Sequence, residues 1–215
     1  MRFSTLTSNR LKKSMPTTKV LWIDGVGSYA MCDGSSISIG QAAPGNVVDL
    51  AIRGELSRRA CFVHRTGGDH VVEPIQSMKI DGRSIDRPAI LTDGCVLTLG
   101  ERVQLRYQRP TLLSSTARLE LVSQHRWQPI LNAALLLGES CVVGPEEQAH
   151  VVCLPPRGIS WGGKFLFFRR GNEWMCRAID CQNLVVDGIP TSAPFLLKPG
   201  LRVQSDVACW SLQNQ

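Results

Sequence analysis

The chain has 215 residues, a hydrophobic share of 43%, a charged share of 20% and a formal net charge of +6 at pH 7. This composition excludes an intrinsically disordered chain, and the length suffices for one large domain or two of ordinary size. The first nineteen residues carry five basic side chains and no acidic one, which leaves +1 for the remainder (+6 less 5). A nucleic-acid-binding surface on the folded part is therefore disfavoured.

Residues 1–18 are predicted to be a disordered basic arm. The arm lacks the apolar core of a secretory signal, and no later run of residues is as long and apolar as a membrane span. We therefore expect a cytoplasmic protein that makes no membrane contact. Met15 precedes the first predicted strand, so a translation start at Met1 or at Met15 fits the sequence.

The cysteine and histidine pattern favours a reduced protein without a metal or other cofactor. The sequence contains no C-x-x-C pair, and the four histidines are scattered along the chain. Several of the eight cysteines lie where a strand would point an apolar residue inward. These eight are Cys32, Cys61, Cys95, Cys141, Cys153, Cys176, Cys181 and Cys209. We expect them to be small core residues rather than disulfide partners or metal ligands.

From Lys19 onward, short β-branched and apolar runs alternate with glycine-containing turns, which is typical of strands and hairpins. In chain order the runs include K-V-L-W-I, S-Y-A-M-C, I-S-I-G, V-V-D-L, A-C-F-V-H-R, H-V-V-E-P, M-K-I-D-G, L-T-D-G-C-V-L-T-L-G and V-Q-L-R-Y. The apolar run at residues 130–137 is too short for a helix and ends at Gly138, so it is predicted to be a buried strand. The pattern predicts an all-β fold.

The chain then repeats itself after a predicted linker at residues 108–116. Ile39-Gly40 recurs as Val143-Gly144, and V-V-D-L as V-V-C-L, both 104 residues later; Leu56-Ser57 recurs as Ile159-Ser160, and Phe62 as Phe165, both 103 later. Asp81-Gly82 recurs as Asp187-Gly188, and L-T-D-G as L-K-P-G, both 106 later. Matches in one order at a nearly constant offset predict a duplication, with two tandem β-sandwich domains at residues 19–107 and 117–215.

The landmarks of the first copy resemble the pattern of forkhead-associated (FHA) domains in order and spacing. They are Gly40-Gln41, Ser57-Arg58-Arg59-Ala60, Asp81-Gly82 and L-T-D-G-C-V-L-T-L-G at residues 91–100. The FHA pattern has a strand ending in Gly-Arg, then Ser-Arg-x-His, Asn-Gly and a late L-x-D-G-D-x-I-x-L-G. The resemblance implies an FHA/SMAD-like sandwich whose loops bind a phosphothreonine peptide, as an interaction module in bacterial-type Ser/Thr kinase signalling.

Three positions depart from the family pattern. Gln41 stands where the family has its phosphate-binding arginine, and it brings no positive charge. Ala60 replaces the histidine that braces the site, and Asp81 replaces the asparagine that holds the peptide main chain. An ionised aspartate donates no hydrogen bond and repels phosphate.

Other residues of the pattern keep chemistry that suits a phosphate dianion. Ser57 offers a hydroxyl donor, Arg58 lies beside it, and Arg53 and Arg59 are close in sequence. The alternative is that the arginines are solvated loop cations and that Asp81-Gly82 is kept only as a good turn. The predicted phosphopeptide site comprises Gln41, Arg53, Ser57, Arg58, Arg59 and Asp81.

The second copy departs further, and no phosphate site is assigned to it. Gly144 precedes Pro145, Ser160 precedes Trp161, and Gly162-Gly163 stands in place of the brace. This copy is expected to pack against the first or to make a phosphate-independent contact. Trp161, Trp174 and Trp210 are its candidate anchors if exposed, although core tryptophan is commoner.

An enzyme is not expected. Cys61 and His64 would point to opposite faces of a strand, and Glu146-Glu147 fits a solvated turn. A weaker hypothesis is nucleic-acid binding through the basic arm at residues 1–18. Two stronger hypotheses remain, both with a protein or peptide partner. One is a phosphothreonine-peptide reader, and the other is a phosphate-independent scaffold made of two degenerate FHA domains.

Overall fold

The computed structural model describes residues 18–111, 114–154, 163–206 and 208–215. Within these ranges the chain forms strands, turns and loops without a helix, so the predicted all-β fold is confirmed. Accordingly, the described chain has no helix long and apolar enough to cross a membrane. Residues 1–17 of the predicted arm and residues 112–113 of the predicted linker lie outside the described residues.

The strands before the predicted linker are β1 (Lys19–Ile23), β2 (Gly27–Cys32), β3 (Ser36–Gln41), β4 (Leu50–Arg53), β5 (Cys61–Thr66), β6 (Asp69–Pro74), β7 (Met78–Ile80), β8 (Arg83–Ile85), β9 (Ala89–Ile90), β10 (Val96–Leu99) and β11 (Val103–Gln108). Those after it are β12 (Ala117–Leu121), β13 (Arg126–Gln128), β14 (Ala133–Leu136), β15 (Ser140–Gly144), β16 (Val151–Val152), β17 (Lys164–Arg170), β18 (Glu173–Ile179), β19 (Val185–Val186), β20 (Ile189–Pro190), β21 (Phe195–Leu196), β22 (Arg202–Gln204) and β23 (Cys209–Asn214).

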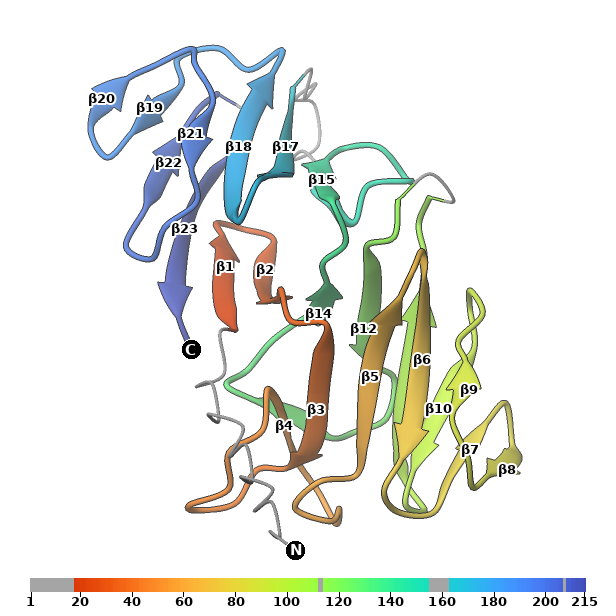
Figure 1. Ribbon diagram of the computed structural model, residues 1–215. Coiled ribbons are helices and arrows are strands. Elements are labelled where there is room, and N and C mark those ends of the chain that lie inside the picture. Colours follow the sequence, from red (N-terminus) through yellow and green to blue (C-terminus); the bar gives the residue numbers. More distant parts are fainter. Residues whose placement is uncertain (1–17, 112–113, 155–162, 207) are drawn as a thin grey trace, which may run out of the picture.

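The strands form three sheets (Figure 1). The large sheet has the order β20-β19-β22-β23-β1-β2-β14-β12-β11-β10-β7-β8, and the smaller ones have the orders β13-β4-β3-β5-β6-β9 and β16-β15-β17-β18-β21. The strands of the two halves are arranged in the same spatial order. The series β11-β10-β7-β8 corresponds to β23-β22-β19-β20, and β4-β3-β5-β6-β9 corresponds to β16-β15-β17-β18-β21. This repetition supports the predicted duplication.

The strand registers correct one of the sequence matches. Ile39 pairs with Cys61 on β5, and Val143 pairs with Phe165 on β17. Phe165 therefore corresponds to Cys61 and not to Phe62. The burial agrees, because Cys61 and Phe165 are both buried whereas Phe62 is only half-buried. Matching by residue type shifted the alignment by one position, which exchanges the inward and outward faces of a strand.

The match between V-V-D-L and V-V-C-L is also displaced. Ile39 lies opposite Leu50, the last residue of the first motif, whereas Val143 lies opposite Val151, the first residue of the second. The loop between the two paired strands is therefore shorter in the second half. The repeated Val-Val pair did not reveal this difference in the sequence. Valine is common throughout β-strands, so a Val-Val pair does not indicate which residue of the neighbouring strand it faces.

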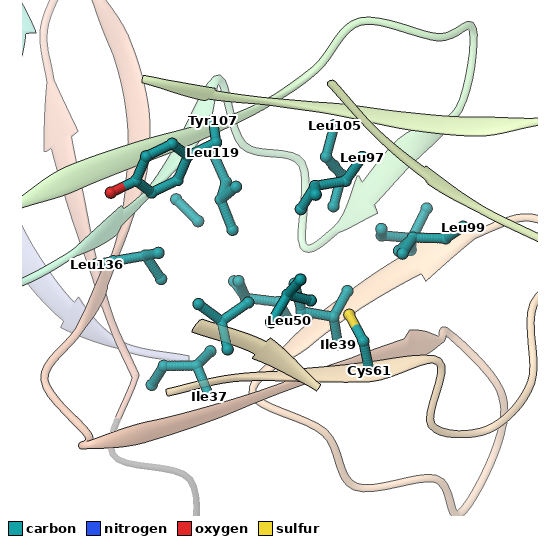
Figure 2. Packing of buried hydrophobic residues seen from close by; sticks show 14 of the residues in the cluster. Ile37, Ile39, Leu50, Cys61, Leu97, Leu99, Leu105, Tyr107, Leu119 and Leu136 are labelled. Atoms are coloured by element: carbon teal, nitrogen blue, oxygen red, sulfur yellow. The ribbon is translucent and has the colours of Figure 1, made fainter. Parts of the chain in front are cut away.

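Two hydrophobic cores lie on opposite faces of the large sheet. The first core is closed by the six-stranded sheet, and Figure 2 shows Ile37, Ile39, Leu50 and Cys61 packing against Leu97, Leu99, Leu105, Tyr107, Leu119 and Leu136. The second is closed by the five-stranded sheet and contains Phe165, Phe167, Trp174 and Trp210 among its members. Both described tryptophan anchors predicted for the second copy are thus core residues, and Trp161 lies outside the described residues.

Strands β2 and β14 lie between the two cores and are buried on both faces, whereas β1 contributes Val20 to the first core and leaves Trp22 exposed. On β2, Tyr29 and Met31 belong to the second core, while Ala30 and Cys32 belong to the first. This explains why the sequences of β2 and β14 are continuous apolar runs without alternation. The predicted strand at residues 130–137 is present as β14, although Ile130 lies outside it and is exposed.

The two halves exchange strands. β1 pairs with β23, the last strand of the chain, and β12 pairs with β11, the last strand before the linker. Parallel pairing between β2 and β14 joins the two parts into one sheet. The division into domains at residues 19–107 and 117–215 stays a prediction, and in the structure each core takes strands from both sides of residues 108–116.

Candidate functional site

Three loops of the first half gather at one end of the molecule, the lower end in Figure 1. They are the β3–β4 loop (residues 42–49), the β4–β5 loop (residues 54–60) and the β6–β7 loop (residues 75–77). Five of the six predicted site residues lie on these loops or on the strand ends beside them. Gathering loops at one end of a sandwich is the usual way to build a binding surface on this architecture.

The absence of a side chain at Gly40 lets the β4–β5 loop cross directly over β3. A Cβ at this position would lie 2.0 Å from the carbonyl oxygen of Arg58. The neighbouring amide of Gln41 donates to the carbonyl of Ser57 at 3.1 Å, and the amide of Ala60 donates to the carbonyl of Ile39 at 2.8 Å. The segment that carries Ser57 and Arg58 is therefore fixed on the end of β3.

Asn46 clamps the β3–β4 loop to this crossing. Its Nδ2 donates to the carbonyl oxygen of Gln41 at 2.7 Å and to that of Arg58 at 2.8 Å. The sequence-based site did not include Asn46, because a single loop asparagine in the segment G-N-V-V reads as an ordinary turn residue. Its proximity to Gly40-Gln41 in the sequence was the only signal that could have identified it.

Gln76 on the β6–β7 loop was also missed, and it holds the other side of the site. Its Oε1 accepts a hydrogen bond from the amide of Ser57 at 2.8 Å. The amides of Ile75 and Gln76 in turn donate to the carbonyl of Ala60 at 2.9 and 3.1 Å. Buried Ala60 thus anchors the β6–β7 loop through its main chain, and a side chain with hydrogen-bonding groups is not needed for this contact.

Ser57, Arg58 and Arg59 are exposed on the β4–β5 loop. The Ser57 hydroxyl and the Arg58 guanidinium make no hydrogen bond or ion pair with any described residue. The Arg59 guanidinium lies over the ring of Phe62, 6.0 Å from its centroid. Arg53 at the end of β4 is exposed, and its Nε donates to Oε1 of Gln128 at 2.5 Å.

Unlike several other arginines of the chain, these three form no ion pair with a described residue. Arg65, Arg109, Arg118 and Arg169 each pair with a carboxylate. Within the described ranges, no carboxylate lies within ion-pair distance of the guanidinium of Arg53, Arg58 or Arg59. The loop end of the first core therefore carries three arginines without a described ion-pair partner, beside the exposed Glu55 of the β4–β5 loop, and such guanidinium groups are available to an anionic ligand.

Gln41 uses part of its side chain locally, since its Nε2 lies 3.4 Å from the carbonyl oxygen of Gly54, to which it donates. Asp81 also has a local partner. It lies in the turn between β7 and β8 at a φ of 49°, and its Oδ1 accepts from the amide of Val96 at 2.9 Å. The structure thus gives Asp81 a turn-stabilising role, and its part in a binding site stays a prediction.

The corresponding end of the second half is electrically compensated. Lys164, the register counterpart of Ala60, has its Nζ 2.6 Å from Oε1 of Glu146. The hydrogen bond from Lys164 holds the pKa of Glu146 below its usual value, so this carboxyl group is charged at neutral pH. The predicted landmark Ile159-Ser160 lies outside the described residues.

The groups weighed for catalysis have other roles. Cys61 is fully buried, and burial raises the pKa of its thiol to about 12, so a nucleophilic thiolate is strongly disfavoured. His64 pairs instead with Glu73, Nε2 to Oε2 at 2.7 Å. All eight cysteines are free, and six of them are buried. The described residues hold no group of three or more histidine, cysteine or acidic side chains that suits a metal ion.

Comparison with known proteins finds similarity only at the level of structure. No protein-family profile and no curated protein sequence matches the chain. Mycobacterium tuberculosis EmbR, solved with a low-affinity phosphopeptide, matches at 16% identity and a TM-score of 0.32, over 43% of this chain and 24% of EmbR. The FHA domain of CT664 from Chlamydia trachomatis matches at 15% identity and a TM-score of 0.30, over 39% of this chain and 90% of its own.

The N-terminal FHA domain of EssC, a component of the bacterial type VII secretion apparatus, matches at 13% identity and a TM-score of 0.25, over 91% of this chain and 92% of that chain. The matched CT664 and EssC structures are FHA domains. At these identities and TM-scores the matches transfer no residue role to this chain.

Proposed function

We propose that the chain is an FHA-type protein-interaction module whose first loop end binds a phosphothreonine peptide in bacterial-type Ser/Thr kinase signalling. One observation carries the proposal. The free hydroxyl of Ser57 and the unpaired guanidinium of Arg58 lie together on a loop that Gly40, Asn46 and Gln76 fix in place. A preformed donor set of this kind binds an anion without the entropic cost of ordering a loop.

The chemistry of the site suits a phosphate dianion. Arg58 supplies charge-assisted hydrogen bonds, and Ser57 supplies a neutral one. Arg53 and Arg59 add positive charge at longer range, which raises the rate of encounter with an anionic peptide. Because Gln41 replaces an arginine, the site has one fewer charged contact, and we expect a correspondingly modest affinity.

The test is a titration with phosphothreonine peptide libraries against their unphosphorylated counterparts, read by fluorescence anisotropy. We expect Ser57→Ala and Arg58→Ala to weaken phosphopeptide binding, Arg58→Ala by roughly 10- to 100-fold, which corresponds to the loss of a charged hydrogen bond. Arg177→Ala is the matched control, since Arg177 is exposed on β18 in the second half. Absence of any phosphate-dependent binding tighter than millimolar would overturn the proposal.

A second candidate is a phosphate-independent scaffold made of two degenerate FHA domains. It is favoured by the contact of the Gln41 amide with Gly54 and by the Lys164–Glu146 pair, which removes net charge from the second loop end. The distinguishing experiment is affinity capture of partners with and without phosphatase treatment. Retention of the same partners after dephosphorylation supports the scaffold, and their loss counts against it.

A further inference from the structure

A strand from beyond the linker completes the six-stranded sheet next to the candidate site. β13 is the edge strand of this sheet and pairs antiparallel with β4, so that Arg126 lies opposite Arg53, Trp127 opposite Ile52 and Gln128 opposite Ala51. Trp127 and Ile52 are buried in the first core. Because side chains alternate along a strand, Arg53, Arg126 and Gln128 share the outer face.

This outer face places two arginines side by side. Like charges directly opposite each other on paired strands are destabilising. Both side chains are exposed, and within the described part of the chain neither guanidinium pairs with a carboxylate. Gln128 holds Arg53 through the 2.5 Å contact between Nε and Oε1, which leaves the terminal nitrogens of Arg53 for a ligand.

A groove of about 670 Å³ is lined by Arg53, and Arg126 lies opposite Arg53 on β13 without lining it. Small apolar side chains of residues 42–44, Val48 and Ala51 line part of the groove, and the side chains of Arg53, Gln128 and Gln215 line the rest. No acidic residue lines it. Asn46 also lines the groove and at the same time holds the carbonyl of Arg58, so the groove and the candidate phosphate site share a wall.

We propose that this groove takes the peptide segment that flanks the phosphothreonine, and that Arg53 and Arg126 select an aspartate or glutamate in that segment. The inference rests on the proposed function for the identity of the ligand, but it concerns a different contact. An acidic side chain offsets the repulsion between the two arginines, while the small apolar wall accommodates an extended main chain. Gln128 acts as a positioning residue for Arg53, so the selectivity depends on both halves of the chain.

The experiment uses the full chain and two matched peptide sets, one phosphorylated on threonine and one not. In each set a single position is changed in turn to glutamate, alanine or lysine, and binding is measured by fluorescence anisotropy. We expect glutamate to bind about fivefold more tightly than alanine at one flanking position, with lysine weaker still, which is the scale of one exposed ion pair. The Arg53→Gln/Arg126→Gln double variant should lose this preference. The Arg126→Gln single variant, which leaves Arg53 of the candidate site in place, should weaken the preference for glutamate and keep the preference for phosphate.

Gln128→Ala should lower the preference for glutamate while circular dichroism and the unfolding midpoint stay unchanged, and Gln124→Ala, at an exposed loop position before β13, is its control. An acidic preference that survives in the double arginine variant, or its absence in the wild type, overturns the inference. Loss of phosphate dependence with the acidic preference retained refutes the proposed function alone. Failure of every peptide to bind refutes both.

Discussion

At the scale of single residues, Asp81 and Asp187 show the same local chemistry in both halves. Asp187 has a φ of 50°, and its Oδ1 accepts from the amide of Arg202 at 2.9 Å, as Asp81 accepts from Val96. A left-handed conformation is costly for most residues but tolerable for aspartate and asparagine. The Asp-Gly pair is therefore retained for the turn, and this role explains it without reference to a ligand.

Replacement of Asp81 separates the turn role from a binding role. We expect Asp81→Ala to lower the free energy of unfolding by about 1–3 kcal/mol, because the variant loses a hydrogen bond and keeps an unfavourable φ. Asp81→Asn should change stability little, since its amide oxygen still accepts from Val96. Denaturant unfolding measures both, and Asp187→Ala is the matched control. An equal loss for the asparagine variant would contradict the turn explanation.

At the scale of strands, two buried histidines each hold a strand in place. His70 on β6 contacts the hydroxyl of Tyr107 on β11, Nδ1 to oxygen at 3.0 Å. His150, just before β16, accepts from the amide of Val142 on β15 at 3.0 Å. Burial lowers the pKa of both imidazoles to about 4, with the charges of Arg65 and Arg109 adding to the effect at His70 and that of Arg118 at His150.

These pKa values predict a loss of stability in mild acid. A histidine whose pKa falls on folding stabilises the protein above its unfolded pKa of about 6.5 and loses that contribution as the pH falls towards 4. We expect the free energy of unfolding to decrease between pH 6.5 and 4, by up to about 1.4 kcal/mol per pH unit for each histidine. The denaturant midpoint should fall with it. His70→Gln and His150→Gln should each flatten this slope. A midpoint independent of pH in this range would contradict the assignment.

Individual strands were predictable from the sequence, because alternation and glycine turns are local. The alternating V-Q-L-R-Y run forms β11, and the apolar run before Gly138 contains β14. The clamps by Asn46 and Gln76 were not predictable, because each depends on which loops meet in space. The pairing of β1 with β23 was equally hidden, since nothing in K-V-L-W-I distinguishes a partner 190 residues away from one in its own half.

At the scale of the whole molecule, the exchange of strands makes the two cores interdependent. Leu119 and Leu136 from beyond the linker pack in the first core, and Leu21 and Ile23 from the start of the chain pack in the second. Removal of either half would leave buried apolar surface exposed on the other. The candidate binding surface is therefore built by both halves of the chain, including the strand that carries Gln128.

A break in the chain tests this interdependence. We expect a protein with a protease site in place of residues 112–113 to stay together after cleavage, eluting as one species in size-exclusion chromatography under native conditions. Each fragment expressed alone should bind a hydrophobic dye and aggregate, because large apolar areas remain uncovered. Mixing the two fragments should restore the complex. Separation of the cleaved halves into two folded species would instead show independent domains.

The pairing of β1 with β23 also has a consequence for biosynthesis. Among the described strands β1 leaves the ribosome first and β23 last, so one edge of β1 stays open until all the other described strands have been made. An unpaired apolar edge is a site where nascent chains associate with one another. Completion of this sheet therefore waits until β23 has been made, and until then β1 depends on other contacts to shield its open edge.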